Sequence, residues 1–332
     1  MVADDDSDND TVEIILAKHK DKNIKTKEVP SEWYDRVKRA RKGQNNLSES
    51  YGNAPWFVES ARASNEEKTI GEYHAPILEL GVTDKAKVPD NVPDEKNGIP
   101  VRIVEREPAQ PESCENDVYS CVPGGALLDF EHPDGDFHSA SGCIFAEKSG
   151  TRYFLTSAHN LTDKEDWCDV DPRGQEVYQG PDEAKKIGEA KEVGWNQDYA
   201  SIEPTTDKDI TGFDNTIIGE YSDVEGYVTK DGLDEMKDSN ATAHRYGMAT
   251  CHESGEVDRI SDQIWCDNEG KWVVITADSD GGDSGGPHYR EFSFEGVISI
   301  IGVHHGSAEN ALSCPAYILN DRGYEFGGSS SC

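Results

Sequence analysis

The chain has 332 residues, of which 66 are acidic and 32 basic, so its formal net charge at pH 7 is −34. This balance argues against nucleic acid as a partner, because phosphate binding depends on Lys and Arg side chains. No apolar run approaches the roughly 20 residues that a helix needs to cross a bilayer, so we expect no membrane span. The length allows two ordinary domains, or one large domain with an extension.

The acidic residues are spread along the whole chain and are not gathered in one tail. Self-repulsion of so acidic a surface opposes a compact state in dilute buffer. Salt shortens the reach of exposed charges to about 3 Å at 1 M, against about 10 Å at 0.1 M. We therefore predict a salt-adapted protein, and an acidic surface without salt adaptation is the alternative.

The eight cysteines are an even number and accompany no redox motif, which favours an oxidising compartment. No Cys-x-x-Cys with a matching partner occurs, so we expect no zinc site, no other metal and no cofactor. Secretion is predicted from this chemistry alone, because the residues after Met1 do not resemble a signal peptide. On the order of a hundred connectivities are open, but the placing of the cysteines suggests Cys114/Cys121, Cys143/Cys168, Cys251/Cys266 and Cys314/Cys332.

The N-terminal part begins with an acidic tail over residues 1–10, which we expect to be disordered. Ser31 precedes a short helical pattern over residues 32–40 and is the expected cap. Residues 51–88 have mixed periodicity that predicts no single element. Residues 101–105 alternate in the manner of a strand.

Residues 106–118 are typical of a linker, and the pattern changes after them to many short strands with frequent turns. Strands of this length and spacing indicate a sandwich or barrels, hence an all-β body. We expect a small mixed α/β N-terminal region over residues 1–110, as a pro-region or accessory region, and a β domain over 111–332. The clearest strands are residues 142–146, 153–156, 272–276 and 297–303.

The run Gly282–Pro287, Gly-Asp-Ser-Gly-Gly-Pro, is the strongest chemical signal. Glycines on both sides of Ser284 let the backbone approach a substrate closely. Such a turn can direct the amides of Gly282 and Ser284 at one point, as an oxyanion hole for acyl transfer requires. The turn also satisfies the Gly-x-Ser-x-Gly elbow of α/β hydrolases, but too few residues follow Ser284 to complete that fold.

Two further residues fit the roles of a base and its orienting carboxylate. His159 follows the apolar strand 153–156 after Ser157 and Ala158, where its ring can face a cleft. Asp198 begins the alternating run Asp-Tyr-Ala-Ser-Ile, which draws its carboxylate toward the interior. A buried Asp that accepts from imidazole Nδ1–H leaves Nε2 free to take the proton of a serine.

These three motifs, Thr-Ser-Ala-His, Asp-Tyr-Ala and Gly-Asp-Ser-Gly-Gly-Pro in chain order, resemble the chymotrypsin-like serine peptidases over about residues 119–325. The resemblance implies two six-stranded antiparallel β-barrels with a catalytic triad of His159, Asp198 and Ser284 between them. It also implies the disulfides Cys143–Cys168 and Cys251–Cys266.

A mature trypsin-type N-terminus is absent before His159, so Asp283 is expected to find a partner other than a new α-amino group.

Substrate selection is left open by two features that imply opposite charges at P1. Asp278 resembles the acidic floor of a trypsin-type S1 pocket, which selects Lys or Arg. In glutamyl endopeptidases, by contrast, a His at the position of His304 and a hydroxyl at that of Ser279 receive a P1 carboxylate. Gly306 and Ser307 continue the same strand and complete the predicted S1 set.

The sequence as a whole predicts a secreted, monomeric serine endopeptidase that acts on polypeptides through an acyl-enzyme. A catalytically silent or autoinhibited binding module on the same fold is one alternative, and a hydrolase of small esters is the other. The adjacent pair His304 and His305 does not by itself make a metal site.

Overall fold

The computed structural model describes residues 10–19, 22–52, 54, 56–89, 91–106, 117–131, 137–162, 168–180, 185–205, 212–266, 268–292, 297–307, 310–328 and 330. Most of them lie in strands, so the prediction of a mostly β protein is confirmed. The predicted tail, up to residue 9, and residues 107–116 of the predicted linker lie outside the described residues.

Six strands of the C-terminal half pair in a closed cycle in which every pairing is antiparallel. Their inward side chains, among them Val257, Ile260, Val273 and Ile275, are almost fully buried and form one core cluster. The cycle is formed by β17 (Thr242–Gly247), β18 (Cys251–Trp265), β19 (Asn268–Ile275), β22 (Ala311–Pro315), β21 (Val297–Ser307) and β20 (Pro287–Phe292).

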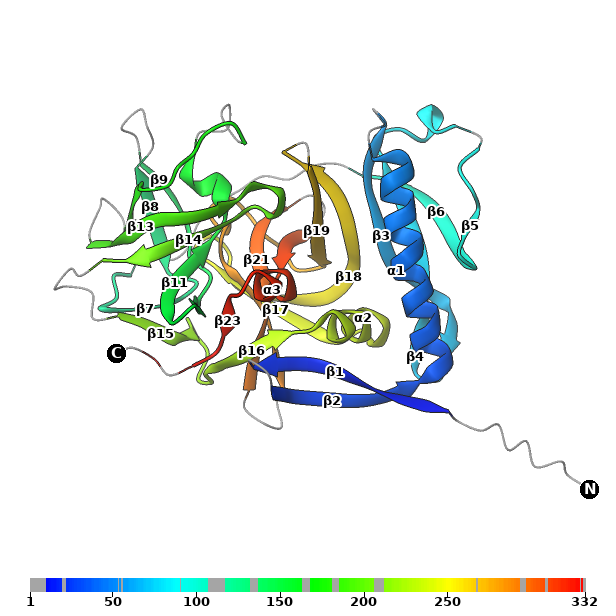
Figure 1. The fold of residues 1–332 in the computed structure, drawn as a ribbon, viewed down its shortest axis with the longest axis horizontal. Coiled ribbons are helices and arrows are strands. Elements are labelled where there is room, and N and C mark those ends of the chain that lie inside the picture. The colour runs from blue at the N-terminus through cyan, green and yellow to red at the C-terminus, as the bar shows by residue number, and fades with distance from the viewer. Residues whose placement is uncertain are drawn as a thin grey trace, which may run out of the picture.

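A second, eight-stranded sheet lies beside this cycle, on the left in Figure 1. Its core includes Phe130, Phe145 and Phe154, and the ring of Phe154 stacks on that of Phe213 at 5.0 Å between centroids. Closure of this sheet into a second barrel stays a prediction. In order across the sheet, the strands are β23 (Glu325–Phe326), β10 (Phe145–Lys148), β11 (Thr151–Thr156), β14 (Tyr199–Pro204), β13 (Lys185–Gly194), β12 (Glu176–Gln179), β8 (Leu127–Glu131) and β9 (Phe137–Ser141).

Short elements connect and flank the two sheets. β7 (Cys121–Gly124) pairs in parallel with β15 (Gly212–Ile217). β16 (Val224–Val228) leads into α2 (Lys230–Ser239), whose N-cap Thr229 accepts a hydrogen bond from the Gly232 amide. α3 (Ala316–Asp321) follows β22 directly.

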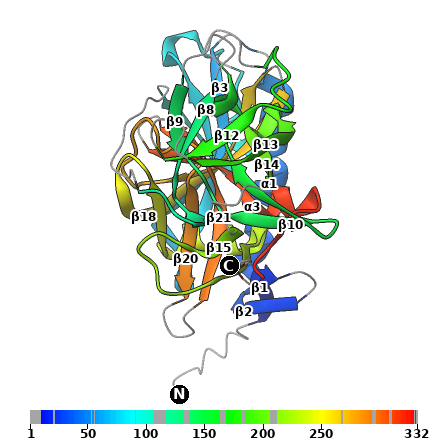
Figure 2. The same ribbon diagram turned by 90° about the vertical axis from the view of Figure 1, so that its left-hand side faces the viewer.

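The N-terminal region adds strands at two places, one to β18 of the six-stranded cycle and one to β16, which itself pairs in parallel with β21 of the cycle. β1 (Thr11–His19) pairs with β16, and β3 (Phe57–Ile70) pairs with β18. Figures 1 and 2 show the β1–β2 hairpin at one end of the molecule, and Figure 1 shows α1 lying across β3 and β4. The remaining elements are β2 (Lys22–Pro30), α1 (Ser31–Tyr51), β4 (Tyr73–Val82), η1 (Lys85–Lys87), β5 (Glu95–Lys96) and β6 (Ile99–Glu105).

The predicted N-terminal helix exists, but it is longer than predicted and its cap was wrong. α1 has 21 residues because buried positions at helical spacing continue through Gln44 and Leu47, which pack on β3 and β4. Its N-cap is Pro30, and no side chain caps it. The unassigned stretch 51–88 contains the whole β3–β4 hairpin, and the exposed residues of β3, 66–69, lie toward the turn.

Three of the predicted disulfides are wrong because the paired cysteines bond or pack elsewhere. Cys168 bonds to Cys266, which is 98 residues away and lies at the β18–β19 turn. Cys143 and Cys314 are free thiols buried in one core cluster, so the Cys314/Cys332 pair is wrong too. Strand order, and not distance along the chain, decides which cysteines meet. Cys121 and Cys251 are disulfide-bonded, whereas Cys114 and Cys332 lie outside the described residues.

No helix in the described ranges is long and apolar enough to cross a membrane.

Buried charges join the N-terminal region to the body. The Arg62 guanidinium on β3 lies 3.0 Å from the Asp234 carboxylate on α2, and both side chains are at most 2% exposed. Arg41 of α1 donates to the same carboxylate at 2.7 Å. Trp33 Nε1 donates to Asp238 at 2.7 Å, and Glu59 accepts from Arg259 at 2.6 Å. Because a buried charge is costly without its partner, these contacts tie the two parts together.

Replacing Asp234 with Ala is expected to lower the free energy of unfolding by about 3–5 kcal/mol, because the Arg62 guanidinium then stays buried without its carboxylate. Denaturant unfolding at constant salt measures this loss. The matched control is Asp35→Ala on α1, whose side chain is 65% exposed and pairs only with the nearby Lys38. Equal small losses in both variants would contradict the structural role given to Asp234.

Candidate active site

Ser284 lies in the turn between β19 and β20, and its backbone is held by residues of the eight-stranded sheet and of the segment that follows β11. Its carbonyl accepts from the Ser141 amide at 2.8 Å and from Asn160 Nδ2 at 3.0 Å. Gly285 has φ +91°, and a Cβ atom there would lie 2.1 Å from the Ser141 carbonyl oxygen. Gly282 has φ +98°. Glycine is therefore required on both sides of Ser284 by backbone conformation and by the close approach of Ser141.

The turn is fixed from inside by a buried ion pair. Asp283 Oδ2 lies 2.8 Å from Arg245 Nη2, and both side chains are at most 1% exposed. The same carboxylate accepts from the amides of Ala249, Thr250 and Asp280 at 2.8–3.1 Å. Asp283 thus has an internal partner, as the missing trypsin-type N-terminus led us to expect.

His159 and Asp198 come together as their motifs predicted. His159 lies in the short helix η2 (Ala158–Leu161) after β11, and Asp198 follows the short helix η4 (Trp195–Gln197). His159 Nδ1 is 2.6 Å from Asp198 Oδ2, and the His159 amide donates to Oδ1 at 2.9 Å. Both oxygens of the carboxylate therefore fix the backbone and the ring of the same histidine.

His305 is a second imidazole on this carboxylate, and it is missing from the predicted site. Its Nδ1 lies 2.5 Å from Asp198 Oδ2, and its carbonyl oxygen accepts from Ser284 Oγ at 3.3 Å. Its ring packs against Trp265 and Trp272 with centroids 4.6 and 4.4 Å away. The sequence shows the His304–His305 pair, but only strand register reveals which member faces Asp198.

The environment of Asp198 keeps it ionised. The side chain is fully buried, and burial by itself favours the neutral acid. The two neighbouring imidazoles and their hydrogen bonds outweigh that effect and hold the pKa of Asp198 well below its ordinary value. A carboxylate that stays charged accepts from both rings, which places the Nδ1 proton on His159.

The amides around Ser284 divide into two sets. Those of Asp283, Gly285 and Gly286 donate to carbonyl oxygens at 2.7–3.2 Å. The amides of Gly282 and Ser284 donate to no group in the described part of the chain. They are the two amides that the sequence predicted for an oxyanion hole.

The two residues predicted to select the charge at P1, His304 and Asp278, differ in burial. His304 is buried, and its Nδ1 lies 2.9 Å from Nε2 of the buried His288. Its own Nε2 is buried and has no hydrogen-bond partner among the described residues. Burial lowers the pKa of both histidines well below the ordinary value, so both are neutral. The side chain of Asp278, by contrast, is exposed.

The other three S1 residues are placed as follows. Ser279 is half-buried, directly before the turn of Ser284. Gly306 lies in β21, and a Cβ there would meet open space. Ser307 ends β21, opposite Ala311 of β22.

The same carboxylate and imidazoles also have the composition of a metal site. Each of His159, Asp198 and His305 has one ring nitrogen or carboxylate oxygen that could bind a metal, and these three atoms lie within 4.8 Å of one another. The hydrogen bonds from both rings to Asp198 already explain why these three groups lie together.

Solved structures of bacterial serine proteases are similar to this chain. One, a glutamic acid specific serine protease that uses a histidine triad in substrate binding, is 22% identical and covers 62% of this chain and 100% of that one, with a TM-score of 0.43. Thermobifida fusca Protease A is 16% identical, and the match covers 63% of this chain and 100% of that protein, with a TM-score of 0.45. Nocardiopsis Protease is 16% identical, and the match covers 62% of this chain and 99% of that protein, with a TM-score of 0.46.

At these identities the likeness is one of fold. The sequence matches no protein-family model and no curated protein.

Proposed function

We propose that this protein is a serine endopeptidase with Ser284 as nucleophile, His159 as general base and Asp198 as the orienting carboxylate. The observation that carries the proposal is the double contact between His159 and Asp198, beside a serine turn with two unpaired amides. A base whose tautomer is fixed by a buried carboxylate is what serine activation requires.

In the proposed reaction, Ser284 Oγ attacks the peptide carbonyl carbon while its proton passes to His159 Nε2. The hydroxyl first turns away from the His305 carbonyl, to which it donates in the free protein. The amides of Gly282 and Ser284 stabilise the oxyanion, and losing one such donor costs roughly 2.7–4 kcal/mol in the transition state. His159 then protonates the leaving amine, and a water molecule that it deprotonates hydrolyses the acyl-enzyme.

His305 has a positioning role in this mechanism. Its Nδ1–H shares Asp198 Oδ2 with the ring of His159, and Trp265 and Trp272 hold it in place. By donating to the carboxylate it stabilises the anion and limits the movement of Asp198.

Active-site labelling tests the nucleophile. A fluorophosphonate probe in multimolar salt is expected to label the unmutated protein and not Ser284→Ala. Peptide hydrolysis by the variant should fall by about 10⁴–10⁶-fold, because nucleophile and base act as a unit.

Absence of label on the folded, unmutated chain would favour the silent binding module. Labelling without any peptide cleavage, but with turnover of small esters, would favour the ester hydrolase.

We also propose that the S1 pocket accepts an acidic P1 side chain through His304. If His288 Nε2–H donates to His304 Nδ1, the proton of His304 lies on its unpartnered Nε2 and is available to a carboxylate. Because the side chain of Asp278 is exposed, it does not provide a buried negative charge for a Lys or Arg side chain at P1. The buried, neutral imidazole pair therefore supports Glu over a basic residue at P1.

Replacing His304 with Phe is expected to reduce the preference for Glu over Gln at P1 by about 10–100-fold, because one hydrogen bond to a charged group is lost. His304→Gln, which keeps an N–H donor, should retain part of the preference. His252→Phe is the control, because that ring is 47% exposed. Ratios of kcat/KM on matched peptides measure the effect, and an unchanged ratio in His304→Phe would refute the assignment.

We propose that the protein is secreted, since the Cys168–Cys266 disulfide favours an oxidising compartment. Salt adaptation, a monomeric state and the division at residue 110 stay predictions. The charges buried between α1, β3 and α2 support a retained accessory region over a removable pro-region, because removal would leave Asp234 without Arg41 and Arg62 and Asp238 without the hydrogen bond from Trp33.

A further inference from the structure

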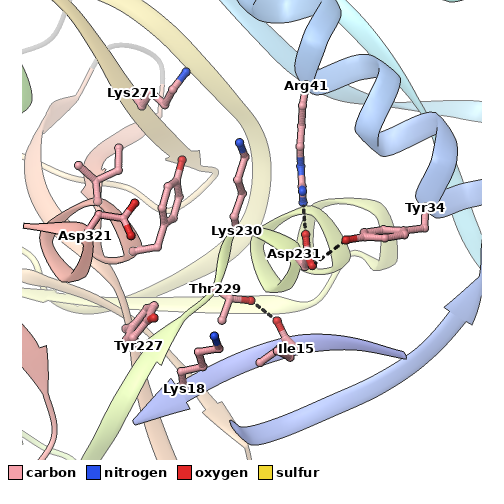
Figure 3. A pocket seen from close by; sticks show the side chains of 12 residues that line it. Ile15, Lys18, Tyr34, Arg41, Tyr227, Thr229, Lys230, Asp231, Lys271 and Asp321 are labelled. Carbon is pink, nitrogen blue, oxygen red and sulfur yellow. Dashed lines mark hydrogen bonds and ion pairs between the residues drawn. The ribbon is translucent and has the colours of Figure 1, made fainter. Parts of the chain in front are cut away.

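A cavity of about 670 Å³ lies where the N-terminal region meets the body, and it is separate from the proposed active site. Its walls come from β1, α1, the β16–α2 junction, β19 and α3. Figure 3 shows Lys18 of β1 and Lys230 of α2 along it, with Arg41 and Asp231 on one side and Lys271 and Asp321 on the other. Each part of the molecule therefore contributes a cation.

The cations of this cavity differ in whether they are paired. Arg41 is neutralised by Asp231 and Asp234, and Lys271 lies 2.6 Å from Asp262. Lys18 and Lys230 form no hydrogen bond or ion pair within the described ranges. The chain has 66 acidic and 32 basic residues, so most lysines could find a carboxylate partner. Two lysines without such a partner at one cavity are therefore unexpected.

Lys230 and Tyr317, which both line the cavity, have no partner for their polar side-chain atoms within the described ranges. Burial lowers the pKa of Lys230 to about 8, and the nearby Arg62 and Arg41 add to that effect. The Tyr317 hydroxyl is buried and has no hydrogen-bond partner in the part of the chain that the structure describes. A buried donor without an acceptor is costly, and an anion in the cavity would accept from both groups.

We propose that this cavity binds a small multivalent oxyanion, a polycarboxylate or a phosphate, between Lys18 and Lys230. The volume far exceeds the roughly 30 Å³ of one water molecule, so it suits a ligand of several atoms. Lys230 is also the first residue of α2, where a helix favours negative charge. The carboxylate of Asp321 on the opposite wall would repel an anion next to it, so we expect the ligand to lie toward Lys18 and Lys230.

Such a ligand would contact the N-terminal region and the body at once. Lys18 belongs to β1, whereas Lys230 and Tyr317 belong to α2 and α3. Because the anion binds only when these parts are docked, it would stabilise the folded chain by mass action. The site does not depend on the peptidase mechanism.

Isothermal titration with citrate and with inorganic phosphate, at constant ionic strength in NaCl, tests the site on the full chain. One equivalent of at least one probe is expected to bind saturably and to raise Tm by ~5 °C at a hundredfold excess over Kd. Citrate and phosphate separate the two ligand chemistries.

Lys230→Met is expected to weaken this binding about tenfold or more, because a hydrogen bond to a charged group is lost. Lys18→Met, on a different strand, provides a second test should Lys230→Met fail to fold. Lys85→Met, an exposed lysine in η1, is the matched control and should bind as the unmutated chain does.

The pH dependence gives an independent readout. An anion favours protonated Lys230, so affinity should be full below pH 8 and should fall as the pH rises through about 8. The other titratable or charged groups that the structure places around Lys230 are Lys18, Tyr34, Arg41, Arg62, Tyr227, Asp231, Asp234, Asp262, Lys271, Tyr317 and Asp321.

Two results would overturn the proposal. One is the absence of saturable binding for both probes. The other is binding that is equally strong in Lys230→Met, Lys18→Met and the Lys85→Met control.

Discussion

The buried carboxylate of Asp198 is the group on which the arrangement of the candidate site depends. It accepts from the His159 amide, from His159 Nδ1 and from His305 Nδ1, and so joins η2, which follows β11 of the eight-stranded sheet, to β21 of the six-stranded cycle. The desolvation of an unpaired charge at this depth would cost several kcal/mol, and these donors offset it. The relative position of Ser284 and His159 follows from this junction, since Ser284 contacts His305 and Asn160 on either side of it.

Buried ion pairs also fix the N-terminal region against the body. An excess of acidic residues leaves few cations, and many of the buried ones lie where α1 and β3 meet α2 and β18. There Arg41 and Arg62 neutralise Asp234 of the body, and Arg259 of the body neutralises Glu59 of β3. The cavity beside this cluster has two lysines without such partners, which is why we assign it a ligand and not a structural ion pair.

The parts of the site that could be predicted from the sequence are those fixed by local motifs. His159, Asp198 and the turn of Ser284 were recognisable because short-range backbone constraints, such as the positive φ of Gly282 and Gly285, impose a short pattern. The role of His305 was not recognisable, because it depends on the register of β21. The disulfide predictions were wrong for the same reason, because Cys168 meets Cys266 only when strand pairing brings the β18–β19 turn beside it. The strands that β1 and β3 add to the body are also long-range pairings without a local signal.

The shared carboxylate can be observed directly by proton NMR. If Asp198 accepts from both rings, two strongly deshielded imidazole Nδ1 protons should be seen at neutral pH, and both should be lost or move upfield in Asp198→Asn. His305→Phe should remove one and leave the other. A single deshielded proton in the unmutated protein, unaffected by His305→Phe, would contradict the arrangement on which the site is built.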